Sequence, residues 1–304
     1  MNREAFPVER TDNVPLAVGT IIFTVFALSL GDALVKMTSG NFVIWQIFVV
    51  RSLIVIPCLG LYLLIKKRPL IRLPDALGWI VLRSLLLVAM WISYYISLPN
   101  LALPVAAAAY YTLPIFITLL SAIIVGDTIN RTGWLAVFLG FIGVLLILRP
   151  QAGDFNWFAL LPLLSAILYA LAMILTRTKC RVENPIILSL ALNIGFVFVG
   201  CVAAAFTTTF PDEARKGFLL APWAAMGFPQ WISMSLLAVA ILIGSIGAAI
   251  AYQNAPSSII GTFDFAYVGF AVLWGIVFFA DIPDDISIMG MALIIGAGIM
   301  SLRQ

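Results

Sequence analysis

The chain has 304 residues, of which 63% are hydrophobic and only 10% are charged, with a net charge of +3 and no His. A soluble globular protein carries roughly 25% charged residues, so this composition excludes a water-soluble body. The absence of His excludes His-based metal sites and general bases, and we expect neither a metal nor a cofactor.

Ten apolar runs, each close to the length that a helix needs to cross a bilayer, fill almost the whole chain. They lie at residues 15–36, 44–65, 77–97, 103–125, 131–148, 156–176, 187–207, 231–252, 258–280 and 286–302. Their apolar character is continuous, without the period of two that a barrel strand shows. Removing the first run as a signal peptide would leave nine spans, so we expect it to stay. The sequence predicts an all-α membrane protein with ten transmembrane helices.

Basic residues gather on one side of these ten spans. Those on the side of the amino terminus are Arg3, Arg10, Lys66, Lys67, Arg68, Arg72, Arg131, Arg177, Lys179, Arg181 and Arg303. Those on the opposite side are Lys36, Arg149, Arg215 and Lys216. Cytoplasmic loops carry the excess of Lys and Arg, so we expect both termini in the cytoplasm and the chain in the cell inner membrane. This topology explains the charges without a nucleic-acid partner.

The spans form two sets of five, and an odd number per set inverts the second set relative to the first. When the sequence is aligned with itself at a shift of 154 residues, Asp127 aligns with Asp281 and Arg149 with Arg303. Each aligned pair lies at the same end of corresponding apolar runs. The predicted division has four parts. They are a cytoplasmic tail at 1–14, a first five-helix repeat at 15–149, a linker at 150–155 and a second, inverted repeat at 156–303.

Three segments of the first repeat carry a resemblance to a known family. They are Leu113-Pro114, Val125-Gly126-Asp127, and the run from Gly140 to Pro150 that contains Gly143-Val144 and stops at Arg149. With Arg51 in the second span, the chain resembles the ten-helix branch of the drug/metabolite transporter superfamily, with two EamA-type repeats. It departs from the family pattern at Asp127, where Glu is usual, and at Val268, where Pro is expected.

Inverted repeats are typical of secondary transporters, in which the substrate site lies between the repeats. We therefore expect a transporter that moves a small amphipathic metabolite, either an amino-acid-like zwitterion or an organic anion, by alternating access. A proton is a candidate coupling ion. The alternatives are an integral-membrane enzyme that acts on lipid and a channel. The chain has no G-x-S-x-G, Walker or G-x-G-x-x-G motif, which disfavours the enzyme.

Ionisable side chains inside spans are costly and indicate function or pairing. Asp264 has no Lys or Arg within its own helix and is the leading candidate for binding a substrate amine or a proton. Asp32 is a second coupling candidate, although its spacing from Lys36 equally predicts a structural ion pair. Arg51 and Arg83 are candidates for holding a substrate carboxylate, and Arg83 could instead reach the cytoplasmic surface.

Aromatic and amide side chains complete the predicted substrate site, since an apolar cavity with a few polar groups is typical of small-molecule binding. They are Trp91, Tyr94, Tyr110, Tyr111, Tyr169, Asn193 and Tyr267. A location at the membrane interface is the alternative for Tyr94, Tyr95 and Tyr252 in particular. Pro57 and Pro114 are predicted to kink their helices, and Gly140 and Gly143 to allow close helix packing.

Overall fold

The structure is a computed structural model that describes residues 12–65, 76–126, 130–148 and 156–301, and these ranges contain helices and turns but no strand. The helices of the first half are α1 (Val14–Thr38), α2 (Ile44–Ile65), α3 (Leu77–Ser97), η1 (Leu98–Asn100), α4 (Leu103–Tyr110), α5 (Leu113–Ile124) and α6 (Arg131–Leu148). Those of the second half are η2 (Trp157–Ala159), α7 (Leu160–Thr178), α8 (Pro185–Thr207), η3 (Asp212–Ala214), α9 (Gly217–Leu220), α10 (Phe228–Asn254), α11 (Ser257–Phe263), α12 (Ala266–Phe279) and α13 (Asp285–Ser301).

Within the described residues, eight helical segments are long and apolar enough to cross a membrane. They match eight of the ten predicted spans, and two of them, Leu103–Ile124 and Ile259–Phe279, are each built from two consecutive α-helices. The fifth and tenth predicted spans form the shorter apolar helices α6 and α13. The all-helical membrane class is therefore confirmed, whereas the count of ten spans stays a prediction.

Asn and Pro set the starts of two long helices. The Asn13 side chain accepts a hydrogen bond from the backbone N–H of Leu16 (3.2 Å), and the Asn184 side chain accepts one from that of Ile186 (3.0 Å). A proline stands in the first turn of each helix, where its missing N–H costs nothing. Pro185 therefore starts α8 two residues before the predicted boundary at 187.

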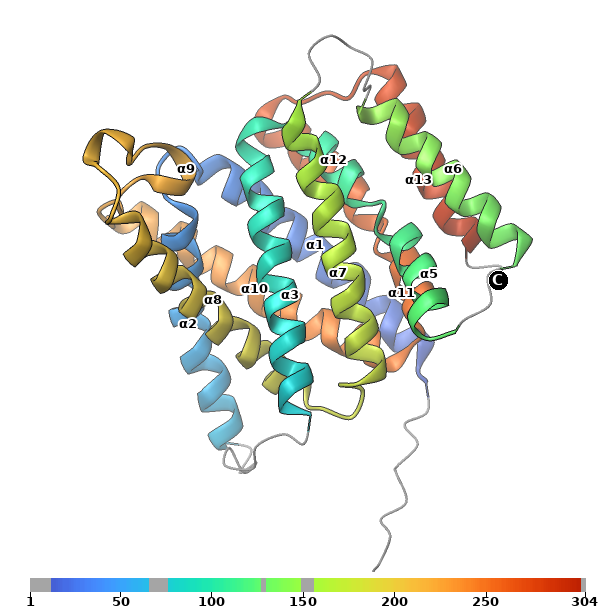
Figure 1. Cartoon of the computed structure of the whole chain (residues 1–304), viewed down its shortest axis with the longest axis horizontal. Coiled ribbons are helices and arrows are strands. Elements are labelled where there is room, and N and C mark those ends of the chain that lie inside the picture. The colour runs from blue at the N-terminus through green and yellow to red at the C-terminus, as the bar shows by residue number, and fades with distance from the viewer. Residues whose placement is uncertain (1–11, 66–75, 127–129, 149–155, 302–304) are drawn as a thin grey trace, which may run out of the picture.

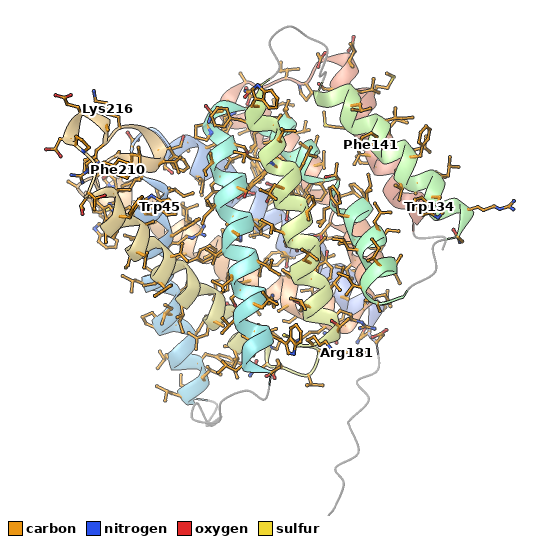
Figure 2. The ribbon with its side chains drawn as sticks, viewed as in Figure 1. Trp45, Trp134, Phe141, Arg181, Phe210 and Lys216 are labelled. Atoms are coloured by element: carbon orange, nitrogen blue, oxygen red, sulfur yellow. The ribbon has the colours of Figure 1, made fainter. Side chains whose placement is uncertain are left out.

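Large apolar side chains cover the outside of the bundle. Figure 2 shows Trp134 and Phe141 pointing away from the body of the protein along α6, where their side chains are 56% and 55% exposed. Arg181 and Lys216 lie at opposite ends of the bundle, away from this apolar surface. An apolar exterior of this extent indicates that lipid, not water, surrounds the helices.

Four helix pairs make the most extensive contacts: α6 with α13, α1 with α10, α3 with α7, and α2 with α8. Every pair joins one helix from each half of the chain, so the halves interlock along their length. The α6–α13 pair forms one flank of the molecule and α2 with α8 lies at the other (Figure 1). The core between these flanks is built from α1, α3, α7, α10 and the four shorter helices α4, α5, α11 and α12.

Candidate functional site

Two membrane-length segments are interrupted near their middles, and the interruptions face the core. One break separates α4 from α5 at Tyr111 and Thr112, and the other separates α11 from α12 at Asp264 and Phe265. The shift of 154 residues that aligns Asp127 with Asp281 also places Tyr110 on Asp264 and Tyr111 on Phe265. The two breaks therefore occupy corresponding positions in the two halves, which is typical of a transporter's binding site.

The first break follows from Pro114, which has no N–H to donate to the preceding turn. The predicted kink is thus confirmed, as an interruption just before α5, whereas α2 continues as a helix through Pro57. The second break has no proline. There the backbone N–H of Tyr267 donates to the carbonyl of Asp264 (3.0 Å) and that of Val268 to Phe265 (3.0 Å). These bonds span three residues, so the helix locally tightens into a 3₁₀ turn, which often marks a functional hinge.

A cavity with about 360 Å³ of space not filled by atoms lies between the breaks. Its described lining comes from α1, α3, α4, α7, α12 and the two breaks. The lining residues are Val25, Leu28, Asp32, Met90, Trp91, Tyr94, Tyr110, Tyr111, Tyr169, Asp264 and Tyr267. It thus brings together both predicted acids and six of the predicted aromatic residues, and none of these lining residues is a Lys or an Arg.

Asp264 is only 1% exposed, and the Tyr252 hydroxyl donates a hydrogen bond to its Oδ2 (2.5 Å). It pairs with no Lys or Arg within the part of the chain that the structure describes. An ionised carboxylate in an apolar interior is costly without compensation. One tyrosine hydroxyl compensates it only in part, so a proton or a bound cation would stabilise this site.

Asp32 is 2% exposed and accepts a hydrogen bond from the Tyr267 hydroxyl, which also pairs with the Tyr94 hydroxyl (2.9 Å). The expected ion pair with Lys36 does not form. Lys36 reaches the opposite way, and its Nζ binds Asp281 (3.0 Å) and the carbonyl of Leu101 (3.0 Å). The spacing of Asp32 and Lys36 allowed a pair, but tertiary packing provided each with a different partner.

Arg51 does not line the cavity. Its guanidinium lies against four aromatic rings, with centroids at 4.6 to 5.8 Å, and these are Phe48, Trp91, Tyr95 and Phe196. Nη1 donates to the Tyr95 hydroxyl (2.9 Å), whereas Nε and Nη2 have no partner among the described residues. Asp32 lies within electrostatic range of this cation. The cation thus lies against Trp91, a lining residue, without lining the cavity itself.

Arg83 and Asn193 also lie outside the cavity lining. Arg83 is 1% exposed and its Nε donates to Thr176 Oγ1 (2.6 Å), so it does not reach a surface as the sequence allowed. Asn193 is buried in α8 and its amide nitrogen donates to the carbonyl of Ser189 (2.9 Å). Arg83 joins α3 to α7, whereas the hydrogen bond of Asn193 stays within α8, and neither side chain lines the cavity.

Three tyrosines for which the membrane interface was the alternative location lie in the core. Tyr94, Tyr95 and Tyr252 are at most 2% exposed. The interface alternative is wrong for them, because each hydroxyl finds a buried partner: Tyr267, Arg51 and Asp264 respectively. Tyr252 is the site residue that the sequence missed. Its position near the end of an apolar run looked like a boundary, but α10 continues to Asn254.

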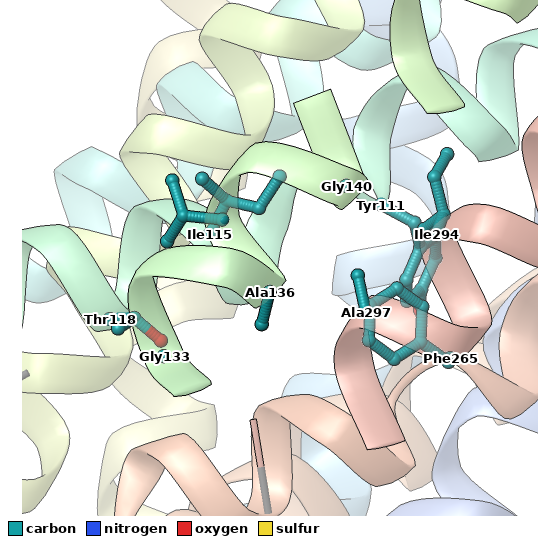
Figure 3. Close-up of a pocket in the computed structure, with 10 residues that line it drawn as sticks. Tyr111, Ile115, Thr118, Gly133, Ala136, Gly140, Phe265, Ile294 and Ala297 are labelled. Carbon is teal, nitrogen blue, oxygen red and sulfur yellow. The ribbon is translucent and has the colours of Figure 1, made fainter. Parts of the chain in front are cut away.

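An apolar gap of about 280 Å³ lies next to the cavity, between α5, α6 and α13 (Figure 3). Its lining includes Ile115, Ala136, Ile294 and the two break residues Tyr111 and Phe265, whose ring centroids lie 5.8 Å apart. Tyr111 borders both spaces. Tyr111 therefore lies between the polar cavity and the apolar gap, with Phe265 beside it on the side of the gap.

Known transporters resemble this chain in sequence. It is 23% identical to the pseudopaline exporter of Pseudomonas aeruginosa, over 91% of this chain and 93% of that protein. It is 21% identical to the S-adenosylmethionine uptake transporter of Rickettsia bellii, over 93% and 91%. It is 27% identical to the riboflavin transporter of Rhizobium johnstonii, over 66% of this chain and only 61% of that protein.

A solved crystal structure shares the fold, with a TM-score of 0.66 over 95% of this chain and 96% of that one, at 16% sequence identity. Residues 15–149 match the sequence profile of the EamA-like transporter family. These bounds coincide with those expected for the first repeat, and the division of the chain into two repeats, 15–149 and 156–303, stays a prediction. Residues 15–149, less than half of the chain, are therefore similar to the EamA-like transporter family.

Proposed function

We propose that this chain is a secondary active transporter that moves a small amphipathic metabolite by alternating access around the central cavity. The observation that carries the proposal is the polar cavity between two helix breaks at corresponding positions of the two halves. Broken helices expose backbone polar groups inside a membrane, which proteins tolerate only where these groups line a cavity or are buried in protein.

The packing of the helices supports the proposed inverted repeats. The α1–α10 pair joins the first predicted span to the eighth, and the α3–α7 pair joins the third to the sixth. A twofold axis that exchanges the halves would therefore map one of these pairs onto the other. Both pairs are among the most extensive contacts. The same axis would map the α2–α8 pair onto itself and the α6–α13 pair onto itself, and the helices of both pairs are in contact.

Alternating access needs contacts at both ends of the bundle that can open in turn. At one end, Lys36 at the end of α1 pairs with Asp281, just after α12. At the other, Arg177 at the end of α7 pairs with Asp12 (2.8 Å), as does Arg181 (2.7 Å). Because α1 and α7 are the first long helices of the two proposed repeats, we propose that these ion pairs close the two ends of the cavity in turn. In the proposed topology the Asp12 gate is cytoplasmic and the membrane is the inner membrane.

The cavity lining favours the amine end of the predicted amphipathic substrate. Two carboxylates and five tyrosines line it, which suits an amine and an apolar body. For an amino-acid-like zwitterion, the candidate partner of the carboxylate is Arg51, which lies outside the lining but within electrostatic range of Asp32. A pure organic anion has no described Lys or Arg to meet in the cavity and is the weaker alternative. A proton on Asp264 or Asp32 is the proposed coupling ion.

Solute counterflow distinguishes the proposed carrier from the channel and enzyme alternatives. The purified chain is first screened by thermal shift against amino acids, nucleosides and amines, since a ligand that binds the folded state raises apparent stability. The strongest hit is then loaded unlabelled into proteoliposomes, and radiolabelled hit is added outside. We expect a transient accumulation of label above equilibrium. Uptake that only approaches equilibrium would indicate a channel, and recovery of a chemically altered hit would indicate an enzyme.

A further inference from the structure

Four tyrosine rings surround the Asp264 carboxylate. Tyr110, Tyr111 and Tyr169 line the cavity with it and lie within electrostatic range of its charge. Tyr252 donates the hydrogen bond to its Oδ2. These rings come from three separate helical segments and the first helix break, so only the folded bundle brings them together.

The rings stand nearly at right angles to one another. The interplanar angle is 87° between Tyr110 and Tyr111, 71° between Tyr110 and Tyr169, and 77° between Tyr169 and Tyr252, with centroids 5.3 to 6.1 Å apart. Successive perpendicular rings cannot stack on a single flat ligand. Rings at such angles present faces in several directions, as do the aromatic boxes by which proteins bind quaternary ammonium groups. Three of the four rings of this box line the cavity, and Tyr252 joins it through its hydrogen bond to Asp264.

Both charged residues of the described cavity lining, Asp32 and Asp264, are acids, while Arg83, outside the lining, lies within electrostatic range of Tyr169. Asp264 is buried and pairs with no Lys or Arg among the described residues, and Arg51 lies against the rings of Trp91 and Tyr95 and does not line the cavity. Asp32, the second carboxylate of the cavity, has Arg51 within electrostatic range, whereas Asp264 does not share that compensation. Asp264, the carboxylate without a compensating cation among the described residues, therefore lies next to the four rings of the aromatic box.

We propose that Asp264 and the rings of Tyr110, Tyr111, Tyr169 and Tyr252 form a binding site for the alkylated ammonium group of an organic cation. This inference rests on the proposed transport function and names the class of its substrate. The carboxylate supplies the opposite charge, and the ring faces contact the alkyl groups around the nitrogen through cation–π attraction. An ammonium group also removes the cost of leaving Asp264 ionised in the core.

Three probes of one shape and different charge test the site. Choline is the cation, 3,3-dimethylbutan-1-ol is its neutral isostere, and 3,3-dimethylbutanoate is a comparable anion. Radiolabelled choline is bound to the purified full-length chain in a scintillation proximity assay and displaced by each unlabelled probe. We expect saturable choline binding and an affinity for the alcohol at least about tenfold weaker, which corresponds to about 1.4 kcal/mol. The carboxylate is expected not to compete.

Matched variants assign this selectivity to the box. Asp264→Asn keeps an oxygen acceptor for Tyr252 and is expected to weaken choline binding about tenfold or more. Asp285→Asn removes an exposed carboxylate on α13 and is expected to change nothing. Tyr169→Leu should weaken binding more than Tyr169→Phe, which keeps the ring. Tyr62→Leu, at an exposed tyrosine on α2, is the control for the loss of a ring.

The outcomes separate this inference from the transport function. Absence of saturable choline binding, equal affinity for choline and the alcohol, or full binding by Asp264→Asn would each overturn the ammonium site. Counterflow of an uncharged hit with no choline binding would leave the transporter standing and the ammonium site refuted. Asp264-dependent choline binding without counterflow of any ligand would establish the site and refute transport.

Discussion

Asp264→Asn is expected to lower counterflow by about tenfold to 100-fold, because a charged hydrogen-bonding group in a buried site contributes about 1.5–3 kcal/mol. The substitution keeps the size of the side chain and an acceptor for the Tyr252 hydroxyl, so the bundle should insert and fold. What it removes is the carboxylate that compensates a substrate cation or carries a proton. Initial counterflow rates of wild-type and variant proteoliposomes, normalised to reconstituted protein, measure the loss.

The control for this experiment is Asp285→Asn, since Asp285 is an exposed acid in the first turn of α13 and lies outside the cavity lining. Running both variants at acidic and at alkaline pH tests the proposed proton coupling, because a rate that depends on Asp264 protonation should lose its pH dependence in Asp264→Asn alone. A variant with the wild-type rate and the wild-type pH response would remove Asp264 from both roles.

The sequence predicted the eight described helical segments that are long and apolar enough to cross a membrane, although it counted ten spans. Continuous apolar runs determine spans directly, because lipid admits little else. Pro114 likewise predicted a local defect, since a missing N–H acts within its own helix. Such features depend on neighbours in the chain and could be derived without a structure.

Features that depend on partners from distant helices could not be predicted. The break at Asp264 and Phe265 contains no proline and no glycine, so it carries no local signal. Lys36 stood one helical turn from Asp32 yet bound Asp281, far away in the sequence. Arg51 looked like a substrate ligand, but it lies against Trp91 and Tyr95 and does not line the cavity. In each case the choice between possible partners was made by tertiary packing.

Gly143→Ala is expected to separate α6 from α13 and to lower the apparent free energy of unfolding by about 1–3 kcal/mol. A Cβ at this position would lie 2.6 Å from the backbone oxygen of Gly290 and 3.2 Å from the backbone nitrogen of Ile294. Backbone atoms of a packed helix cannot rotate away, so the two helices must move apart. Without a hydrophobic driving force in lipid, helices associate through such close contacts.

Gly296→Ala is the matched control for this prediction. It also replaces a glycine within an apolar helix of the same pair, but no heavy atom lies within 4 Å of its added Cβ. Alanine raises helix propensity at both positions by about 1 kcal/mol, so the difference between the two variants isolates helix packing. Because α6 and α13 line the apolar gap and Tyr111 lies between that gap and the cavity, Gly143→Ala should slow counterflow as well. Thermal unfolding in detergent measures stability, and equal transition temperatures for the two variants would show that α6 and α13 do not depend on this contact.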